Sequence, residues 1–205
     1  MKYRGNLTDY RCDLKQRILD VAMPVFKRRG VKSVRMDEIA SMLSISKRTL
    51  YEIYDDKETL LLAGIRRNTE SLESHIDTFA ATAGNEMEIL IEYLRIHMRD
   101  LRDVSPAYLL DVRRYKRVVE YMRSHNAEQR VRSMAFISHG VEHGYFVSNF
   151  KYDLFVDIVD AVMRHIMSTR MYEKYPLNEI MHALAMILFR GCCTEKGRQI
   201  LDRAL

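Results

Sequence analysis

The chain has 205 residues, of which 47% are hydrophobic and 30% are charged, as expected for a folded protein of one or two domains. Its three cysteines, two of them adjacent, exclude a disulfide framework and suit a reducing cytoplasm. No apolar run approaches the roughly 20 residues of a membrane span, and no apolar segment follows the N-terminal charges as in a secretory signal. We therefore expect a cytoplasmic protein that makes no membrane contact.

Positive charge is concentrated near the N-terminus. Residues 1–60 contain thirteen Lys or Arg and nine Asp or Glu, a net charge of +4, whereas residues 61–205 contain twenty and nineteen, a net charge of +1. An excess of this kind suits a polyanionic partner. Residues 1–7 are expected to form a basic arm.

Apolar periodicity predicts an all-α fold, because only 3 prolines and 8 glycines interrupt the chain. Start signals at Asn85, Ser105-Pro106 and Asp153, and a stop at Gly144, divide the C-terminal part. The only clear linker is the small polar segment 80–85. The helices expected in chain order cover residues 9–29, 35–42, 47–54, 55–79, 85–102, 106–124 (with a break near Val112), 126–143, 153–172, 175–190 and a tail over 194–205.

Two short helical patterns in the basic part of the chain predict a helix-turn-helix. The first ends near Met42, and the second runs from Lys47 to about Tyr54. Ser46, just before the second helix, can accept a bond from a backbone N–H that has no partner within the helix. A short capped helix that begins with cations, a hydroxyl and a phenol is suited to reading the major groove of DNA.

Candidate DNA contacts gather at the start of this second helix and beside it. Cationic and hydroxyl side chains there can reach phosphates or base edges. The predicted contacts are Arg35, Ser46, Lys47, Arg48, Thr49, Tyr51, Tyr54 and Lys57. The sequence has neither a glycine-rich phosphate loop nor a credible catalytic set, so we predict no enzymatic activity and no cofactor.

These residues resemble the TetR family of transcriptional regulators. The resemblance covers roughly residues 14–62 with the right spacing, and beyond about residue 65 it is limited to the helical layout. The matching positions are Ile18, Ala22, Phe26, Gly30, Met36, Ile39, Ala40, Ile45-Ser46, Leu50-Tyr51, Tyr54 and Lys57-Glu58-Leu60. The resemblance implies a three-helix DNA-binding domain, here residues 1–56, followed by a helical ligand-binding and dimerisation domain over residues 57–205.

Two positions depart from the family pattern. Ser44 stands where glycine is usual, so the turn must form without the residue that most easily adopts a positive φ. Arg35 stands where a hydroxyl usually starts the second helix. This leaves Ser33 as the candidate cap and allows Arg35 itself to touch a phosphate.

The resemblance also implies a homodimer that binds double-stranded operator DNA. Family members pair two C-terminal helices of each subunit into a four-helix bundle, and by position these lie near residues 153–172 and 177–190. The alternative is that their apolar faces only fill the core of a monomer. Those faces contain Leu154, Ile158, Ala161, Val162, Ile166, Leu177, Ile180, Ala183, Leu184, Ile187 and Leu188.

Two further motifs have simple structural interpretations, which we prefer. His139-Gly140-Val141-Glu142-His143 matches the zinc-binding pattern H-x-x-E-H, but no third ligand is apparent and Gly140 weakens the helix, so no metal site is predicted. Cys192 and Cys193 could form a redox pair, but small buried thiols are the preferred interpretation.

The residues and the resemblance together predict a ligand-responsive, DNA-binding transcriptional regulator. We expect a repressor that is released from operator DNA by a small-molecule effector, whose binding residues the sequence does not identify. The alternative is a helical protein–protein adaptor or sensor that keeps the fold without binding DNA.

Overall fold

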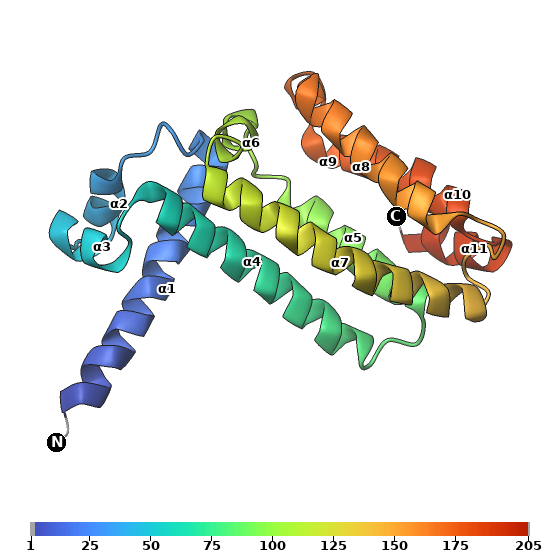
Figure 1. Cartoon of the computed structure of the whole chain (residues 1–205), viewed down its shortest axis with the longest axis horizontal. Helices are drawn as coiled ribbons and strands as arrows, with labels where there is room; N and C mark the ends of the chain where they lie inside the picture. The colour runs from blue at the N-terminus through green and yellow to red at the C-terminus, as the bar shows by residue number, and fades with distance from the viewer. Residues whose placement is uncertain (1–2, 205) are drawn as a thin grey trace. The chain divides into compact units, whose positions relative to one another are not determined.

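A computed structural model describes residues 3–204, and the side chains of residues 10–204 (Figure 1). Over these residues it confirms the all-α prediction: the only β-type pairing is an isolated bridge between Phe146 and Cys193. No helix in this part of the chain is long and apolar enough to cross a membrane. The helices are α1 (Tyr3–Arg29), α2 (Met36–Met42), α3 (Lys47–Ile53), α4 (Lys57–Ala80), α5 (Glu86–Asp100), α6 (Pro106–Val112), α7 (Lys116–Glu142), α8 (Tyr152–Ser168), the 3-10 helix η1 (Met171–Glu173), α9 (Leu177–Leu184), the π-helix η2 (Ala185–Phe189), α10 (Arg190–Cys192) and α11 (Glu195–Ala204).

The chain forms two compact units. Unit 1 combines Met1–Ser71 with Asp103–Arg123, and unit 2 combines Leu72–Arg102 with Ser124–Leu205. Helices α4 and α7 therefore each contribute residues to both units. The predicted boundary at residue 56 separates a DNA-binding from a ligand-binding domain and stays a prediction. The two compact units are instead defined by which residues pack together.

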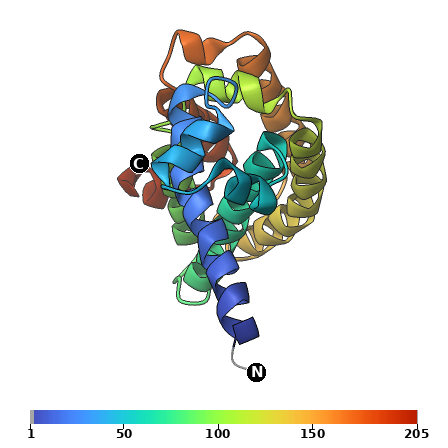
Figure 2. The same ribbon diagram turned by 90° about the vertical axis from the view of Figure 1, so that its left-hand side faces the viewer.

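Unit 1 is built on the apolar side of α1. Leu14, Ile18 and Phe26 of this helix are almost completely buried, together with Ile39 of α2 and Leu50 of α3. These contacts hold α2 and α3 beside α1 (Figure 2). The same core includes side chains of α6 and of the start of α7, which explains why residues 103–123 fold with the N-terminal helices.

Unit 2 has a separate core. Met87 and Leu94 of α5 pack in one cluster with Phe146, Phe155 of α8 and Leu201 of α11. The tail helix predicted over residues 194–205 is confirmed as α11. Each unit thus buries its own apolar side chains.

Helix starts that depend on local signals are confirmed. The side chains of Ser46, Asn85 and Ser105 each accept a backbone N–H bond from the residue three positions later. Asp153 is not the cap that we predicted, because α8 begins one residue before it and its cap position, Lys151, makes no side-chain bond.

Helix lengths differ from the prediction in three places. Helix α1 begins at Tyr3, so residues 3–7 of the expected basic arm are helical, while residues 1–2 lie outside the described part of the chain. Helix α6 ends at Val112 as predicted, but α7 begins about ten residues before the expected start at 126. The last main helix is interrupted by the π-helical turn η2.

The turn between α2 and α3 is made without glycine, as predicted. Ser44 has a φ of +54°, in the left-handed region. Its N–H donates to the carbonyl of Ser41 at 3.1 Å, and the N–H of Ile45 donates to the carbonyl of Ala40 at 3.0 Å. The turn is therefore closed by hydrogen bonds, at the cost of a conformation that side chains disfavour.

Replacing Ser44 with glycine should stabilise the protein. The left-handed region costs a non-glycine residue about 1–2 kcal/mol. Glycine removes this cost but loses more conformational entropy on folding, so we expect the free energy of unfolding to rise by about 0.5–1 kcal/mol. Urea unfolding measures it. Ser41→Gly, within the neighbouring helix α2, is the control and should destabilise; a loss of stability in Ser44→Gly would contradict the argument.

Candidate nucleic-acid interface

The start of α3 is ordered by its cap. Ser46 Oγ accepts the N–H of Thr49 at 3.0 Å and shares a hydrogen bond with Thr49 Oγ1 at 2.7 Å. Leu50 is completely buried, which fixes the rotation of the helix about its axis. Lys47 and Arg48 are consequently exposed at the front of α3, where DNA could be contacted.

The two cations at the start of α3 are each paired with a carboxylate. Lys47 Nζ lies 2.9 Å from Asp37 of α2, and this hydrogen bond raises the pKa of Lys47. Arg48 Nε lies 2.9 Å from Glu52, one turn along α3, and 88% of the Arg48 side chain is exposed. Exposed ion pairs are weak, so phosphates can replace these carboxylates.

Tyr51 and Arg35 complete the exposed set. The ring of Tyr51 is 38% exposed, and Lys47 Nζ lies 5.9 Å from its centroid, within range of a cation–π contact. Arg35 occupies the cap position of α2 and makes no side-chain cap bond. Ser33 does not cap α2 as we had expected, because its hydroxyl donates to the carbonyls of Arg29 and Gly30 at 2.7 and 3.0 Å.

Tyr54, also predicted as a DNA contact, is buried in the core of unit 1. It is only 5% exposed, and its hydroxyl lies 3.4 Å from the Lys15 carbonyl of α1, to which it donates. Burial raises the pKa of Tyr54. The residue four positions after Leu50 lies on the same side of the helix, so its ring fills the core and has no surface from which to reach a phosphate.

Lys57 is also engaged within unit 1. Its ammonium donates to the carbonyls of Val31 and Lys32, at 3.0 and 3.5 Å, in the loop between α1 and α2. Partial burial lowers its pKa, and the charge of Asp111 opposes that effect. Helix α4, which begins at Lys57, is capped by Asp56, whose Oδ1 accepts the N–H of Thr59 at 2.6 Å.

Two features that the sequence did not reveal bear on this surface. The first is the pairing of Lys47 with Asp37, because ten positions and a turn separate the two residues. The second is charge: with residues 103–123 included, unit 1 contains twenty Lys or Arg and thirteen Asp or Glu, a net charge of +7, whereas unit 2 has thirteen and fifteen, a net charge of −2. The basic excess is therefore larger on the helix-turn-helix unit than the N-terminal sequence alone indicated.

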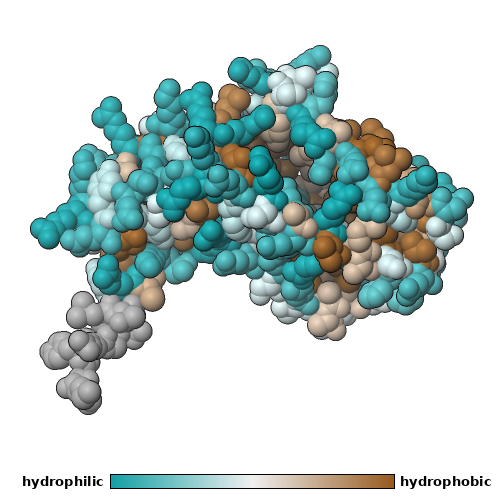
Figure 3. Space-filling model, viewed as in Figure 1, coloured by the Kyte–Doolittle hydropathy of each residue, from teal (hydrophilic) through white to brown (hydrophobic). Residues whose placement is uncertain are grey.

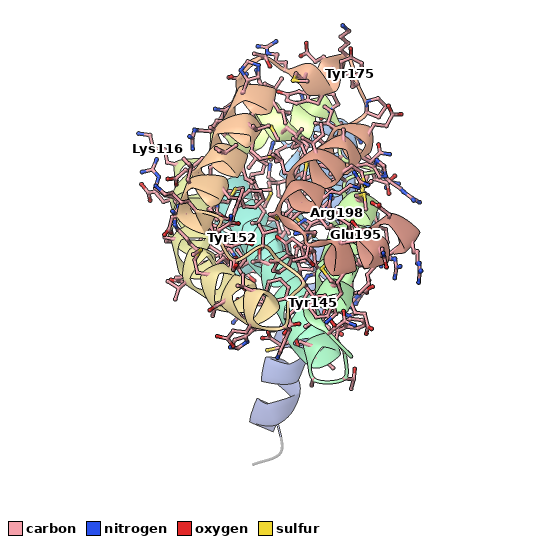
Figure 4. The ribbon with its side chains drawn as sticks, turned by 90° about the vertical axis from the view of Figure 1, so that its right-hand side faces the viewer. Lys116, Tyr145, Tyr152, Tyr175, Glu195 and Arg198 are labelled. Carbon is pink, nitrogen blue, oxygen red and sulfur yellow. The ribbon has the colours of Figure 1, made fainter. Side chains whose placement is uncertain are left out.

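The remaining motifs form no site of their own. His143 Nδ1 is hydrogen-bonded to Glu86 at 2.7 Å, and no cluster of three or more metal-binding side chains occurs among the residues whose side chains are described. Cys192 and Cys193 are 3% and 2% exposed, and a hydrogen bond with Cys193, together with burial, raises the pKa of Cys192. In α11, Glu195 and Arg198 pair with one another at 3.6 Å (Figure 4).

Helices α2 and α3 are joined by a short turn, and α3 begins with the exposed cations Lys47 and Arg48. This arrangement defines a helix-turn-helix protein. Residues 18–63 match the model of the family described as bacterial regulatory proteins, tetR family. This match confirms, for the N-terminal part of the chain, the resemblance to the TetR family drawn from residues 14–62.

Similar proteins agree with this assignment. An uncharacterised HTH-type transcriptional regulator of Mycobacterium tuberculosis is 35% identical over 91 residues, which are 44% of this chain and 45% of that protein; the match thus spans about half the length of this relative. A TetR-family regulator from Agrobacterium tumefaciens has the same fold, with a TM-score of 0.71 and 15% identity over 90% of this chain and 100% of that one. A transcriptional regulator from Saccharomonospora viridis, solved in complex with choline, has a TM-score of 0.68 and 18% identity over the same shares.

Removal of the cap should loosen α3 selectively. Ser46→Ala leaves the N–H of Thr49 without its acceptor, and we expect a loss of about 1 kcal/mol in the free energy of unfolding. Ser46→Asp keeps an acceptor at the same position and should retain most of the stability. Chemical denaturation of the three proteins measures both effects, and equal stability of Ser46→Ala and the unchanged protein would show that the cap contributes nothing.

Proposed function

We propose that this protein is a dimeric DNA-binding transcriptional regulator, and that it acts as a repressor released from its operator by a small-molecule effector. The observation that carries the proposal is the front of α3, where a capped helix presents Lys47, Arg48 and Tyr51 to solvent. These are side chains that contact phosphates and base edges in the major groove. The surface above α2 and α3 is largely hydrophilic (Figure 3).

DNA binding would proceed by exchange of ionic partners. Lys47 and Arg48 would leave Asp37 and Glu52 for phosphates, and the released counterions would make affinity fall steeply with salt. The carboxylate of Asp37 stays near the phosphates after the exchange and opposes binding. This gives the reading surface a built-in limit on non-specific affinity.

Dimerisation would place two copies of α3 about 34–36 Å apart, one DNA turn, so that they enter successive major grooves. An apolar stripe on unit 2 supports a dimer: Leu154, Ile158 and Ala161 of α8 are exposed, as are Ala183 of α9 and Ile187 of η2. Apolar side chains gather over α8 in Figure 3. Ile166, Leu177 and Ile180 are buried, so we leave these three residues out of the dimer interface predicted from the sequence.

Effector control would follow from linkage between two sites. A molecule that binds better when the two α3 helices are spread lowers DNA affinity, and DNA lowers the affinity for that molecule by the same factor. Helix α4 is the proposed lever, since its residues belong to both units. A Saccharomonospora protein of the same fold was solved in complex with choline, which supports control by a small molecule without identifying the ligand of this chain or its site.

DNA recognition is tested by selection from a pool of random duplexes, followed by affinity measurement over a range of salt concentrations. Lys47→Ala should weaken binding about tenfold and lower the slope of log K against log salt by about 0.9, one phosphate contact. Asp37→Asn should act in the opposite direction and tighten binding. Lys174→Ala, which removes an exposed lysine of unit 2, is the control and should change neither quantity.

Failure of the unchanged protein to enrich any sequence would contradict DNA recognition and favour the adaptor alternative. Unchanged affinity in Lys47→Ala would mean that α3 is not the reading helix.

The dimer is tested by charges placed on the apolar stripe. Ile158→Glu and Ile187→Glu would each bury a carboxylate without a partner, and we expect the dimer dissociation constant to rise at least about a hundredfold. Light scattering at micromolar concentrations should then report monomers. Val131→Glu replaces a side chain of α7 that is 73% exposed and lies outside the stripe, so it should leave the dimer intact. A dimer in all three variants would place the interface elsewhere.

A further inference from the structure

Asp111 is an exception in the burial pattern. Among residues 10–204 it is the only charged residue that the structure buries, with 7% of its surface exposed. A buried carboxylate is costly unless hydrogen bonds or opposite charges compensate it. Its partners therefore indicate what this side chain holds in place.

The strongest bond of Asp111 reaches the loop between α1 and α2. Asp111 Oδ2 accepts the backbone N–H of Lys32 at 2.7 Å, although the two residues are 79 positions apart. Arg114, on the same segment, lies 3.8 Å from the carboxylate, which is too far for a strong contact. Bonds from N–H to carboxylate are among the stronger hydrogen bonds, so this one ties α6 to the loop.

The backbone around Lys32 is shaped to receive α6. Gly30 has a φ of +83°, and a Cβ on it would lie 2.9 Å from Ala107 Cβ and 3.0 Å from Asp111 Oδ2. A second hydrogen bond joins the same regions: the carbonyl of Lys27, near the end of α1, accepts the N–H of Ser105, the residue before α6, at 2.8 Å. Helix α6 and the end of α1 are thus joined at two hydrogen bonds and one close backbone approach.

Lys57 holds the same loop from the other side. Its ammonium donates to the carbonyls of Val31 and Lys32, and the negative charge of Asp111 raises the pKa of Lys57 against the effect of burial. The loop is therefore held between an anion on α6 and a cation at the start of α4. This arrangement accounts for Lys57 without a phosphate contact.

We propose that Asp111 is a positioning residue for DNA reading: by holding the N–H of Lys32, it sets the loop from which α2 and α3 are suspended. Helix α2 begins at Met36, four residues after Lys32, so a loop that slides along α6 moves the helix-turn-helix relative to α1. Segment 103–123 is inserted between two segments of unit 2. The bond between Asp111 and Lys32 therefore joins the loop before α2 to a segment that the chain connects to unit 2 at both ends.

The proposal rests on the proposed DNA binding and is tested with a duplex that the unchanged protein selects. Asp111→Ala should raise the dissociation constant about tenfold while leaving the slope of log K against log salt unchanged, because no phosphate contact is lost. Asp111→Asn keeps an oxygen that can accept the Lys32 N–H, and should bind within about threefold of the unchanged protein. Hydrogen exchange at the Lys32 amide should accelerate in Asp111→Ala and stay slow in Asp111→Asn.

Val118→Ala separates positioning from stability. Val118 is completely buried in the core of unit 1, and the variant should lower the melting temperature without loosening the loop. DNA affinity in Asp111→Ala should fall well below that of Val118→Ala at an equal fraction folded. If Asp111→Ala does not fold, Asp111→Ser, whose hydroxyl is too short to reach Lys32, takes its place.

Affinity equal to the unchanged protein in Asp111→Ala, or an equal loss in Asp111→Asn or Val118→Ala, would overturn the positioning role. If the unchanged protein selects no DNA, the proposed function fails by itself. Slow Lys32 exchange in Asp111→Ala would show that the carboxylate does not hold the loop, whatever the outcome with DNA.

Discussion

Unit 1 is constrained by the need to compensate one buried negative charge. A buried carboxylate needs N–H donors and positive charge near it, and Asp111 has the Lys32 amide at 2.7 Å and the Arg114 guanidinium at 3.8 Å. Residue 30 must lack a side chain, because its φ is +83° and a Cβ there would lie 2.9 Å from Ala107 Cβ and 3.0 Å from the Asp111 carboxylate. The conformation of the loop before the helix-turn-helix is thus fixed by electrostatics as well as by the apolar burial of Val31 and Val34.

The surface proposed to contact DNA, at the start of α3, is held differently. Its ionic pairs, Lys47 with Asp37 and Arg48 with Glu52, are exposed and cost little to break, whereas the Ser46 cap and the buried Leu50 keep the helix in place while they break. The backbone at the start of α3 is therefore held in place, while the side chains of Lys47 and Arg48 can change partners. Such a surface can exchange partners without refolding.

Local features could be predicted from the sequence, and long-range ones could not. The caps at Ser46 and Ser105 and the left-handed turn at Ser44 depend on residues within a few positions, so their signals are contiguous. The burial of Tyr54 could not be predicted, because a phenol suits both a core and a phosphate contact and periodicity does not choose between them. Asp111 gave no signal at all, since its partner lies 79 positions away.

The apolar stripe on unit 2 depends on an irregular helical turn, the π-helix η2. In an uninterrupted α-helix, residue 187 would lie on the same face as Ile180, which is 7% exposed, because seven residues complete nearly two turns. Ile187 is instead 70% exposed, while Ala185 and Cys192 are buried. The π-helical turn η2 adds a residue to the turn and rotates the following side chains, which transfers one large apolar residue from the core face to the surface. A rare helical turn that exposes an isoleucine beside Ala183 leaves an apolar surface that a monomer gains nothing from, and the proposed dimer would cover it.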